Sequence, residues 1–281
     1  MMGTFGVVLS GGGVLCAAEI GMLQALRDWG IHPEVVVGCS GGGIIAGALG
    51  AGVPLDALAA TLRVVCAHPD RYGLGVLRAA EDVLRKDATP GLWTLRPALE
   101  DVLLHAKEAT VDGWAPGYGV VATDLGNGSP VMFWGGGPRG RTTMNVLQAT
   151  SAFPGLFEGV REFDDGTKDY LLADGGLLNN TPGDLAVLLG AGRLLVMDFD
   201  GASPLPATLS PLDVLYRSVQ AAIRAAQRPE PKVPTLRINP TLPSGAWLLG
   251  YDLYPQLVEA GYAAAVAQRG EIEALARGAV P

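Results

Sequence analysis

One short segment holds a serine in surroundings suited to nucleophilic catalysis. Residues 38–42 read Gly-Cys-Ser-Gly-Gly, which fits the pattern G-x-S-x-G with Ser40 at its centre. The apolar run Val35–Val37 and the helical run Ile44–Leu49 flank the segment, as the strand, sharp turn and helix of this pattern require. A flexible glycine loop is the alternative interpretation, and the flanking elements favour catalysis. We therefore predict that Ser40 is a nucleophile. The elbow that holds it consists of Gly38, Cys39, Gly41 and Gly42.

A nucleophilic serine needs a base, and this chain offers few candidates. Its three histidines are His32, His68 and His105, whereas the α/β-hydrolase order places a histidine last. Their loop-like or helical surroundings favour a surface role. A carboxylate that is held against the serine and partly shielded from water can take the proton instead. Asp174 follows the apolar run Tyr170–Ala173 and precedes two glycines, so we predict that Asp174 is the base. A plain turn aspartate would have the same neighbours.

A third group must stabilise the negative charge of the transition state. Gly11, Gly12 and Gly13 follow the apolar run Phe5–Leu9. Three successive glycines let backbone N–H groups point toward a substrate oxygen at the start of a helix, so we predict an oxyanion hole there. Two phosphate-binding motifs compete. The dinucleotide fingerprint needs a glycine where Cys16 stands, and the P-loop needs a Lys-Ser/Thr pair that is missing, so neither motif fits.

Strands that alternate with helices must bring these groups together. The alternation predicts a three-layer α/β/α fold with a mostly parallel sheet. Residues 120–123 and 131–134 read as a hairpin, which makes the sheet mixed. Residues 55–107 are helical in pattern, so we expect one domain over residues 1–281 with a helical cap or insertion at about 55–110. The other predicted elements are helices at 14–29, 144–151, 185–189 and 254–276, a helix opened by Ser210 that ends before Pro229, and strands at 170–173, 194–199 and 236–238.

Composition excludes several classes of protein. The chain has 20 Lys and Arg against 28 Asp and Glu, a net charge of -8, so nucleic acid is not an expected partner. No histidines or cysteines have metal-ligand spacing, and we expect neither a metal nor an organic cofactor. Three cysteines without a C-x-x-C pair indicate a reducing compartment, most simply the cytoplasm.

One uncharged run has the length of a membrane-spanning helix. Val35–Leu55 contains 21 residues without a charge. Its seven glycines and its strand-then-turn pattern argue against a span. The N-terminus lacks the basic and long apolar stretches of a secretory signal. We expect a cytoplasmic protein, with transient contact with a membrane surface and the oligomeric state left open.

Four blocks of sequence, in this order, resemble the patatin-like phospholipase family. The resemblance covers most of the chain, and residues 121–125 and 260–262 also look like this family. It implies the patatin-like fold, a catalytic dyad of Ser40 and Asp174, an oxyanion hole at the glycine-rich turn, and hydrolysis of lipid acyl esters through an acyl-enzyme. The four blocks are residues 11–13 (GGG), 38–42 (GCSGG), 152–157 (AFPGLF) and 174–182 (DGGLLNNTP).

The implied substrate is a lipid or acyl ester of the kind cleaved by phospholipases A, lysophospholipases or esterases. The chain departs from the family pattern at Leu15, where Arg or Lys is usual, and at Glu19, where histidine is common. The missing cation favours neutral esters over anionic phospholipids. Two other functions stay open at this point. The same dyad can transfer the acyl group to an alcohol, and a lipid-binding regulatory protein can keep the pocket without turnover.

Overall fold

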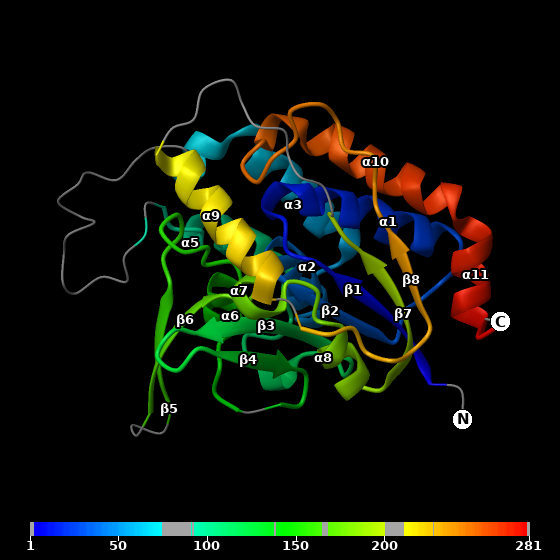
Figure 1. Ribbon diagram of the computed structural model, residues 1–281, viewed down its shortest axis with the longest axis horizontal. Coiled ribbons are helices and arrows are strands. Elements are labelled where there is room, and N and C mark those ends of the chain that lie inside the picture. The colour runs from blue at the N-terminus through cyan, green and yellow to red at the C-terminus, as the bar shows by residue number, and fades with distance from the viewer. Residues whose placement is uncertain are drawn as a thin grey trace.

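A single β-sheet organises the chain in the computed structural model (Figure 1). The structure describes residues 3–74, 91, 93–137, 139–164, 168–199, 211–226 and 228–279. Within these residues the sheet has eight strands in the order β5-β6-β3-β2-β1-β7-β8, with β4 paired to β3. The strands are β1 (Thr4–Leu9), β2 (Val35–Cys39), β3 (Tyr118–Asp124), β4 (Ser129–Trp134), β5 (Val160–Asp164), β6 (Lys168–Asp174), β7 (Ala191–Met197) and β8 (Thr235–Ile238).

Strands β1 and β2 are central because their residues are apolar on both faces of the sheet. Every residue of β2 is buried. Along β1, the side chains of Val7 and Leu9 enter the larger hydrophobic cluster, whereas Val8 enters a second cluster on the other face. The larger cluster packs against α1 (Ala17–Asp28), α2 (Ser40–Gly50), α6 (Thr143–Thr150), α10 (Tyr254–Ala267) and α11 (Arg269–Arg277). Helix α8 (Gly183–Leu188) covers the other face, so the predicted three-layer α/β/α fold is confirmed.

Three strands meet at β3 in a way that decides where the site lies. Strands β1, β2, β3, β7 and β8 pair in parallel, and β4 and β6 pair with β3 in the antiparallel sense. Because β4 occupies one edge of β3 along Gly119–Asp124, β2 and β6 must share the other edge. Strand β2 ends where Cys39 pairs with Val121, and β6 ends where Asp174 pairs with Ala122. The two strands therefore run toward each other and end at neighbouring positions.

Helices α1 and α10 pack with their backbones in contact (Figure 1). A side chain on Gly21 of α1 would overlap the carbonyl of Val258, and one on Gly261 of α10 would overlap the carbonyl of Ala18. These two glycines allow α10 to lie against α1, the first α-helix after the glycine-rich turn.

Most predicted elements are confirmed. The sequence does not predict strand β5, because Val160–Asp164 has only five residues and three of them are charged. The predicted helix at 254–276 is two helices, α10 and α11, separated at Gln268, whose backbone leaves the helical region at φ -114° and ψ 19°. The predicted helix after Ser210 is α9 (Pro211–Ala226), and Ser210 itself lies outside the described residues.

The range predicted to form a helical cap contains helices, and the long uncharged run contains a strand and a helix. Helices α3 (Leu55–Ala67) and α5 (Arg96–Val102) lie within 55–110, and residues 75–90 and 92 of that range lie outside the described residues. The uncharged run folds as β2 followed by α2 and a turn. Among the helices that the structure describes, none combines the length and apolarity needed to cross a bilayer.

Candidate active site

Ser40 occupies a strained turn between a strand and a helix. It is the first residue of α2 and directly follows β2, and its φ of 53° makes it the one non-glycine residue with positive φ in the described part of the chain. Such a backbone is costly for a residue with a side chain and is found where function requires it. A side chain on Gly38 would overlap the carbonyl of Gly42, so the turn tolerates only glycine there. This geometry agrees with the elbow predicted from the sequence.

Thr150 holds the elbow in place, and sequence reasoning missed it. The backbone N–H of Ser40 donates to Thr150 Oγ1 at 3.1 Å, and the Thr150 hydroxyl donates to the carbonyl of Val121 at 2.6 Å. Thr150 is fully buried, so these partners replace water for all three groups. The contact ties the strained turn to β3. A threonine at the end of a predicted helix carries no sequence signal that would identify this role.

Ser40 and Asp174 lie together, as predicted. The Ser40 hydroxyl donates to Asp174 Oδ2 at 2.7 Å. The other carboxylate oxygen, Oδ1, accepts from the backbone N–H of Gly176 at 2.8 Å. Asp174 is 2% exposed, and burial raises its pKa from 3.8 to about 6, against the opposing effect of the hydrogen bonds from Ser40 and Gly176. The carboxyl group is therefore both shielded from water and ionised near neutral pH.

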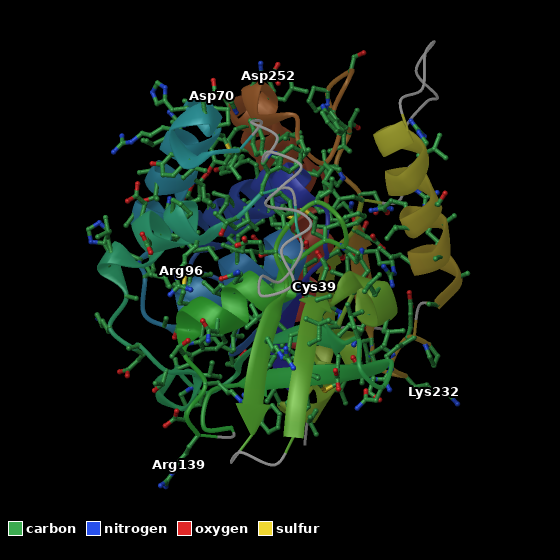
Figure 2. All side chains as sticks on the ribbon, turned by 90° about the vertical axis from the view of Figure 1, so that its left-hand side faces the viewer. Cys39, Asp70, Arg96, Arg139, Lys232 and Asp252 are labelled. Carbon is green, nitrogen blue, oxygen red and sulfur yellow. The ribbon has the colours of Figure 1, made fainter. Side chains whose placement is uncertain are left out.

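No histidine takes part in this arrangement. His32, His68 and His105, all within the described residues, are exposed, and none borders the cavity that contains Ser40. The two cysteines nearest the serine are buried, and burial raises the pKa of Cys16 and of Cys39 well above the usual value for a thiol. Neither thiol competes as a nucleophile, because the neutral form is the less reactive one. Figure 2 shows Cys39 deep among the side chains, with Arg139 and Lys232 at the periphery.

The three glycines of the predicted oxyanion hole do not have equivalent surroundings. The N–H of Gly11 donates to the carbonyl of Asn180 at 3.0 Å, and Asn180 Nδ2 donates back to the carbonyl of Gly11 at 3.1 Å. Within the described residues no such contact engages the N–H groups of Gly12 and Gly13. Gly13 has a φ of 58° and lines the same cavity as Ser40. Gly11 thus fixes the turn, and Gly12 and Gly13 keep their donors available.

An apolar cavity of about 120 Å³ adjoins the serine. Ser40, Gly13 and Gly41 are among the residues that line it. Its other walls are mainly aliphatic and aromatic side chains from α2, α3, α5 and the chain after α6, among them Ile44, Leu62, Leu99, Phe153 and Leu248. A hydrocarbon chain fits such a wall because it exchanges water for apolar contacts. The cavity therefore places apolar surface directly beside the proposed reacting hydroxyl.

Glu19 lies buried behind the elbow. The residue is fully buried, and within the described residues neither carboxyl oxygen has a hydrogen-bond partner. A side chain on Gly42 would meet Glu19 Oε2 at 2.8 Å and the carbonyl oxygens of Leu9 and Ser10 at 2.7 Å. Burial therefore raises the pKa of Glu19 well above its usual value. A neutral carboxylic acid can stay among carbonyl oxygens where a carboxylate would be repelled.

Several known proteins are similar to this chain in sequence. The chain is 29% identical to a patatin-like phospholipase domain-containing protein of Caenorhabditis elegans over 69% of this chain and 13% of that protein. It is 25% identical to an uncharacterized NTE family protein of Mycobacterium tuberculosis, over 76% of this chain and 34% of that protein. It is 24% identical to neuropathy target esterase of Drosophila melanogaster, over 69% of this chain and 13% of that protein. The chain thus spans about a third or less of the length of these relatives.

Two solved structures are also similar. VipD from Legionella pneumophila has a TM-score of 0.44 at 15% identity, over 93% of this chain and 67% of VipD. The ExoU–SpcU complex of Pseudomonas aeruginosa contains a chain with a TM-score of 0.42 at 16% identity, over 94% of this chain and 51% of that one. The family model of patatin-like phospholipases matches residues 7–187, which include Ser40, Asp174 and the glycine-rich turn. The chain belongs to the patatin-like phospholipase family.

Proposed function

We propose that this protein is a serine acyl hydrolase that cleaves lipid acyl esters by a Ser40–Asp174 dyad. The observation that carries the proposal is the 2.7 Å hydrogen bond from the Ser40 hydroxyl, which lines an apolar cavity, to a buried carboxylate. A serine hydroxyl is a weak nucleophile until a base takes its proton, and Asp174 has the position and the pKa to act as that base.

The proposed reaction uses protein groups and water alone. Ser40 Oγ attacks the acyl carbonyl carbon while Asp174 accepts its proton. The N–H groups of Gly12 and Gly13 stabilise the tetrahedral oxyanion. When the intermediate collapses, the C–O bond to the alcohol breaks and Asp174 returns the proton to the leaving alcohol oxygen. Water then attacks the acyl-enzyme, Asp174 takes a proton from it, and the fatty acid leaves as Ser40 recovers its hydrogen.

The predicted helical cap contributes residues to the proposed acyl-chain site. Leu62 and Val65 of α3 and Leu95 and Leu99 beside or within α5 line the apolar cavity. We propose that the chain is one domain with a helical cap at about 55–110, in which α3 and α5 cover the acyl-chain site. A lipid reaches such a site from a membrane surface, so we also propose transient contact with that surface by a cytoplasmic protein.

Labelling by a fluorophosphonate, followed by assays on a panel of acyl esters, tests the function. Wild type should be labelled and should release fatty acid, and Ser40→Ala should do neither. A folded wild-type protein without label contradicts the hydrolase and favours a lipid-binding regulatory protein. Product analysis with a competing alcohol separates hydrolysis from acyl transfer, because transfer yields a new ester instead of free acid.

A further inference from the structure

A second cavity lies beside the glycine-rich turn. Several charged side chains line it, in contrast to the apolar cavity beside Ser40. It measures about 560 Å³, and no residue of the described chain lines both cavities. Gly11, Gly12 and Leu15 form the wall shared with the turn. Four arginines, from α9, the chain after it and β8, line the rest together with other side chains, and we call this space the arginine cavity. The arginines are Arg217, Arg224, Arg228 and Arg237.

The arginine cavity concentrates positive charge in an acidic protein. Its four arginines face three acidic residues, Asp184, Asp198 and Glu230, whereas the whole chain has a net charge of -8. Arg217 and Arg224 are seven residues apart on α9, so both lie on the same face of the helix. A cavity whose cations outnumber its anions, within a surface of the opposite sign, is suited to a negatively charged ligand.

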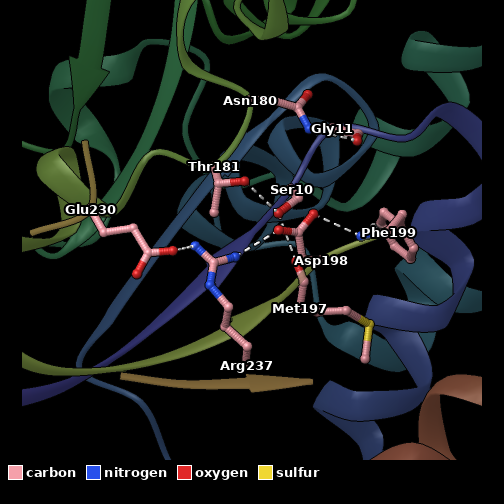
Figure 3. Close-up of polar contacts among 9 residues, drawn as sticks. All are labelled: Ser10, Gly11, Asn180, Thr181, Met197, Asp198, Phe199, Glu230 and Arg237. Carbon is pink, nitrogen blue, oxygen red and sulfur yellow. Dashed lines mark hydrogen bonds and ion pairs between the residues drawn. The ribbon is translucent and has the colours of Figure 1, made fainter. Parts of the chain in front are cut away.

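Ion pairs hold two of the guanidinium groups in fixed positions. Arg237 Nη1 lies 2.6 Å from Asp198 Oδ2, and its Nη2 pairs with Glu230 (Figure 3). Arg228 Nη1 lies 2.6 Å from Asp184 Oδ2. A guanidinium group has five N–H donors, and these contacts use only some of them. Arginines oriented in this way bind phosphate or carboxylate oxygens through their remaining donors.

The wall of the arginine cavity lies next to Ser40. A side chain on Gly11 would begin 3.1 Å from the Cβ of Ser40. Asn180, which also lines the arginine cavity, holds Gly11 through two hydrogen bonds (Figure 3). An ester bound at Ser40 therefore has apolar surface on one side of the turn and arginines on the other.

We propose that the arginine cavity binds the phosphate-bearing alcohol portion of an acyl ester, while the acyl chain occupies the apolar cavity. The proposal rests on the function proposed above. It replaces the expectation, drawn from Leu15, that a missing cation favours neutral esters. Leu15 lines the arginine cavity, so arginines from α9 and β8 provide positive charge beside the position that lacks it.

Paired substrates test the proposal. Lysophosphatidic acid and monoacylglycerol with the same acyl chain differ only in the phosphate. Wild type should have a kcat/KM at least about tenfold higher for lysophosphatidic acid, mainly through a lower KM, because charge-assisted contacts bind the phosphate. The double variant R217Q/R224Q should lose most of this preference. The matched control, Arg277→Gln, removes an exposed arginine of α11 that lines neither cavity. Equal kcat/KM values for the two esters in wild type overturn the proposal.

Direct binding separates failure of this proposal from failure of the hydrolase assignment. Calorimetry on Ser40→Ala protein measures glycerol 3-phosphate binding without any turnover. Binding that weakens about tenfold in the added R217Q/R224Q background supports the site even if no ester is cleaved. Absence of binding overturns it whatever the esterase assays show. Inorganic phosphate distinguishes the source of the anion: if it binds as tightly as glycerol 3-phosphate, the cavity is a free-phosphate site and the substrate assignment is wrong.

Discussion

The hydroxyl of Ser40 and the carboxylate of Asp174 are joined by a 2.7 Å hydrogen bond although 134 residues separate them in the chain. The cause is the pairing around β3. Strand β2 is parallel to β3 and β6 is antiparallel to it, and both lie on the same edge, where Cys39 and Asp174 pair with the adjacent residues Val121 and Ala122. The hydrogen-bond ladder of one strand therefore fixes the distance between nucleophile and base.

Removal of either member of the dyad should abolish ester hydrolysis without unfolding the protein. Ser40→Ala deletes the attacking oxygen. Asp174→Asn keeps the shape and an oxygen that can accept from the N–H of Gly176, but an amide cannot take the serine proton. Each variant should lose at least about a thousandfold in kcat. Steady-state kinetics measures the loss, and urea denaturation checks the fold. Substantial turnover by a folded Asp174→Asn protein would show that another group is the base.

The pH dependence of kcat/KM should report the pKa of Asp174. Only the carboxylate form accepts a proton, and burial places this pKa at about 6. Activity should therefore be full near neutral pH and fall as pH decreases through about 6, by about tenfold per pH unit below that value. Rates measured with a neutral ester at constant ionic strength give the profile. An acid limb with an inflection near 4 would contradict a buried base.

Thr150→Val should loosen the elbow, because valine has the shape of threonine without its hydroxyl. The change leaves the N–H of Ser40 and the carbonyl of Val121 buried without their partner. The expected cost is about 1–3 kcal/mol in the free energy of unfolding, together with a lower kcat. Thr150→Ser is the matched control, since it keeps the hydroxyl. Urea denaturation and ester kinetics measure both effects, and equal behaviour of the valine and serine variants would exclude the proposed role.

Local sequence patterns are sufficient to predict the elbow and the strand ends, but not the contacts between them. The turn itself requires glycine at Gly38, where a side chain would overlap the carbonyl of Gly42, so the spacing of Gly38 from Ser40 is visible in the sequence. Asp174 is recognisable as a strand end for the same reason. Thr150 is different, because its role depends on which residue of β3 lies beside the elbow. That register is set by long-range pairing, which a single sequence does not display.

The arginine cavity escaped prediction for a related physical reason. Arg217 and Arg224 lie on the polar face of an amphipathic helix, and such a face normally contacts water. Their meeting with Arg237 depends on where α9 packs relative to β8. Strand β5 was missed because it lies at the edge of the sheet, where charged residues replace the apolar run that marks a central strand.

Gly38→Ala should prevent formation of the active elbow. The added methyl group would overlap the carbonyl of Gly42, and a backbone atom cannot move aside as a flexible side chain can. We expect an insoluble or inactive protein. Gly270→Ala is the matched control: no heavy atom lies near its added methyl group, and it lies in α11, where alanine should stabilise the protein by about 0.5–1 kcal/mol. Expression, thermal unfolding and ester kinetics compare the two. Wild-type activity in Gly38→Ala would mean that the elbow is wider than described.

Glu19→Gln should make the protein more stable at alkaline pH. In the folded protein burial raises the pKa of Glu19 well above its usual value. The folded state therefore binds a proton that the unfolded state releases, and the free energy of unfolding falls as pH rises from about 4.5 toward the folded pKa. Among the described residues, the titratable side chains that interact with Glu19 are Cys16, Cys39 and Asp198, and none of them carries a positive charge that would offset this effect.

Glutamine has no proton to lose, and its amide can donate to the carbonyl oxygens near Glu19. Urea denaturation at several pH values should give a curve for Glu19→Gln that declines less steeply than that of wild type and lies above it at pH of about 8. The control has the opposite sign: Arg269 lowers the pKa of Glu273, so the stability deficit of Glu273→Gln relative to wild type should develop as pH rises toward about 4.5 and stay constant above that value. Parallel curves for wild type and Glu19→Gln would show that Glu19 is ionised in the folded protein, and a cation would then have to balance its charge.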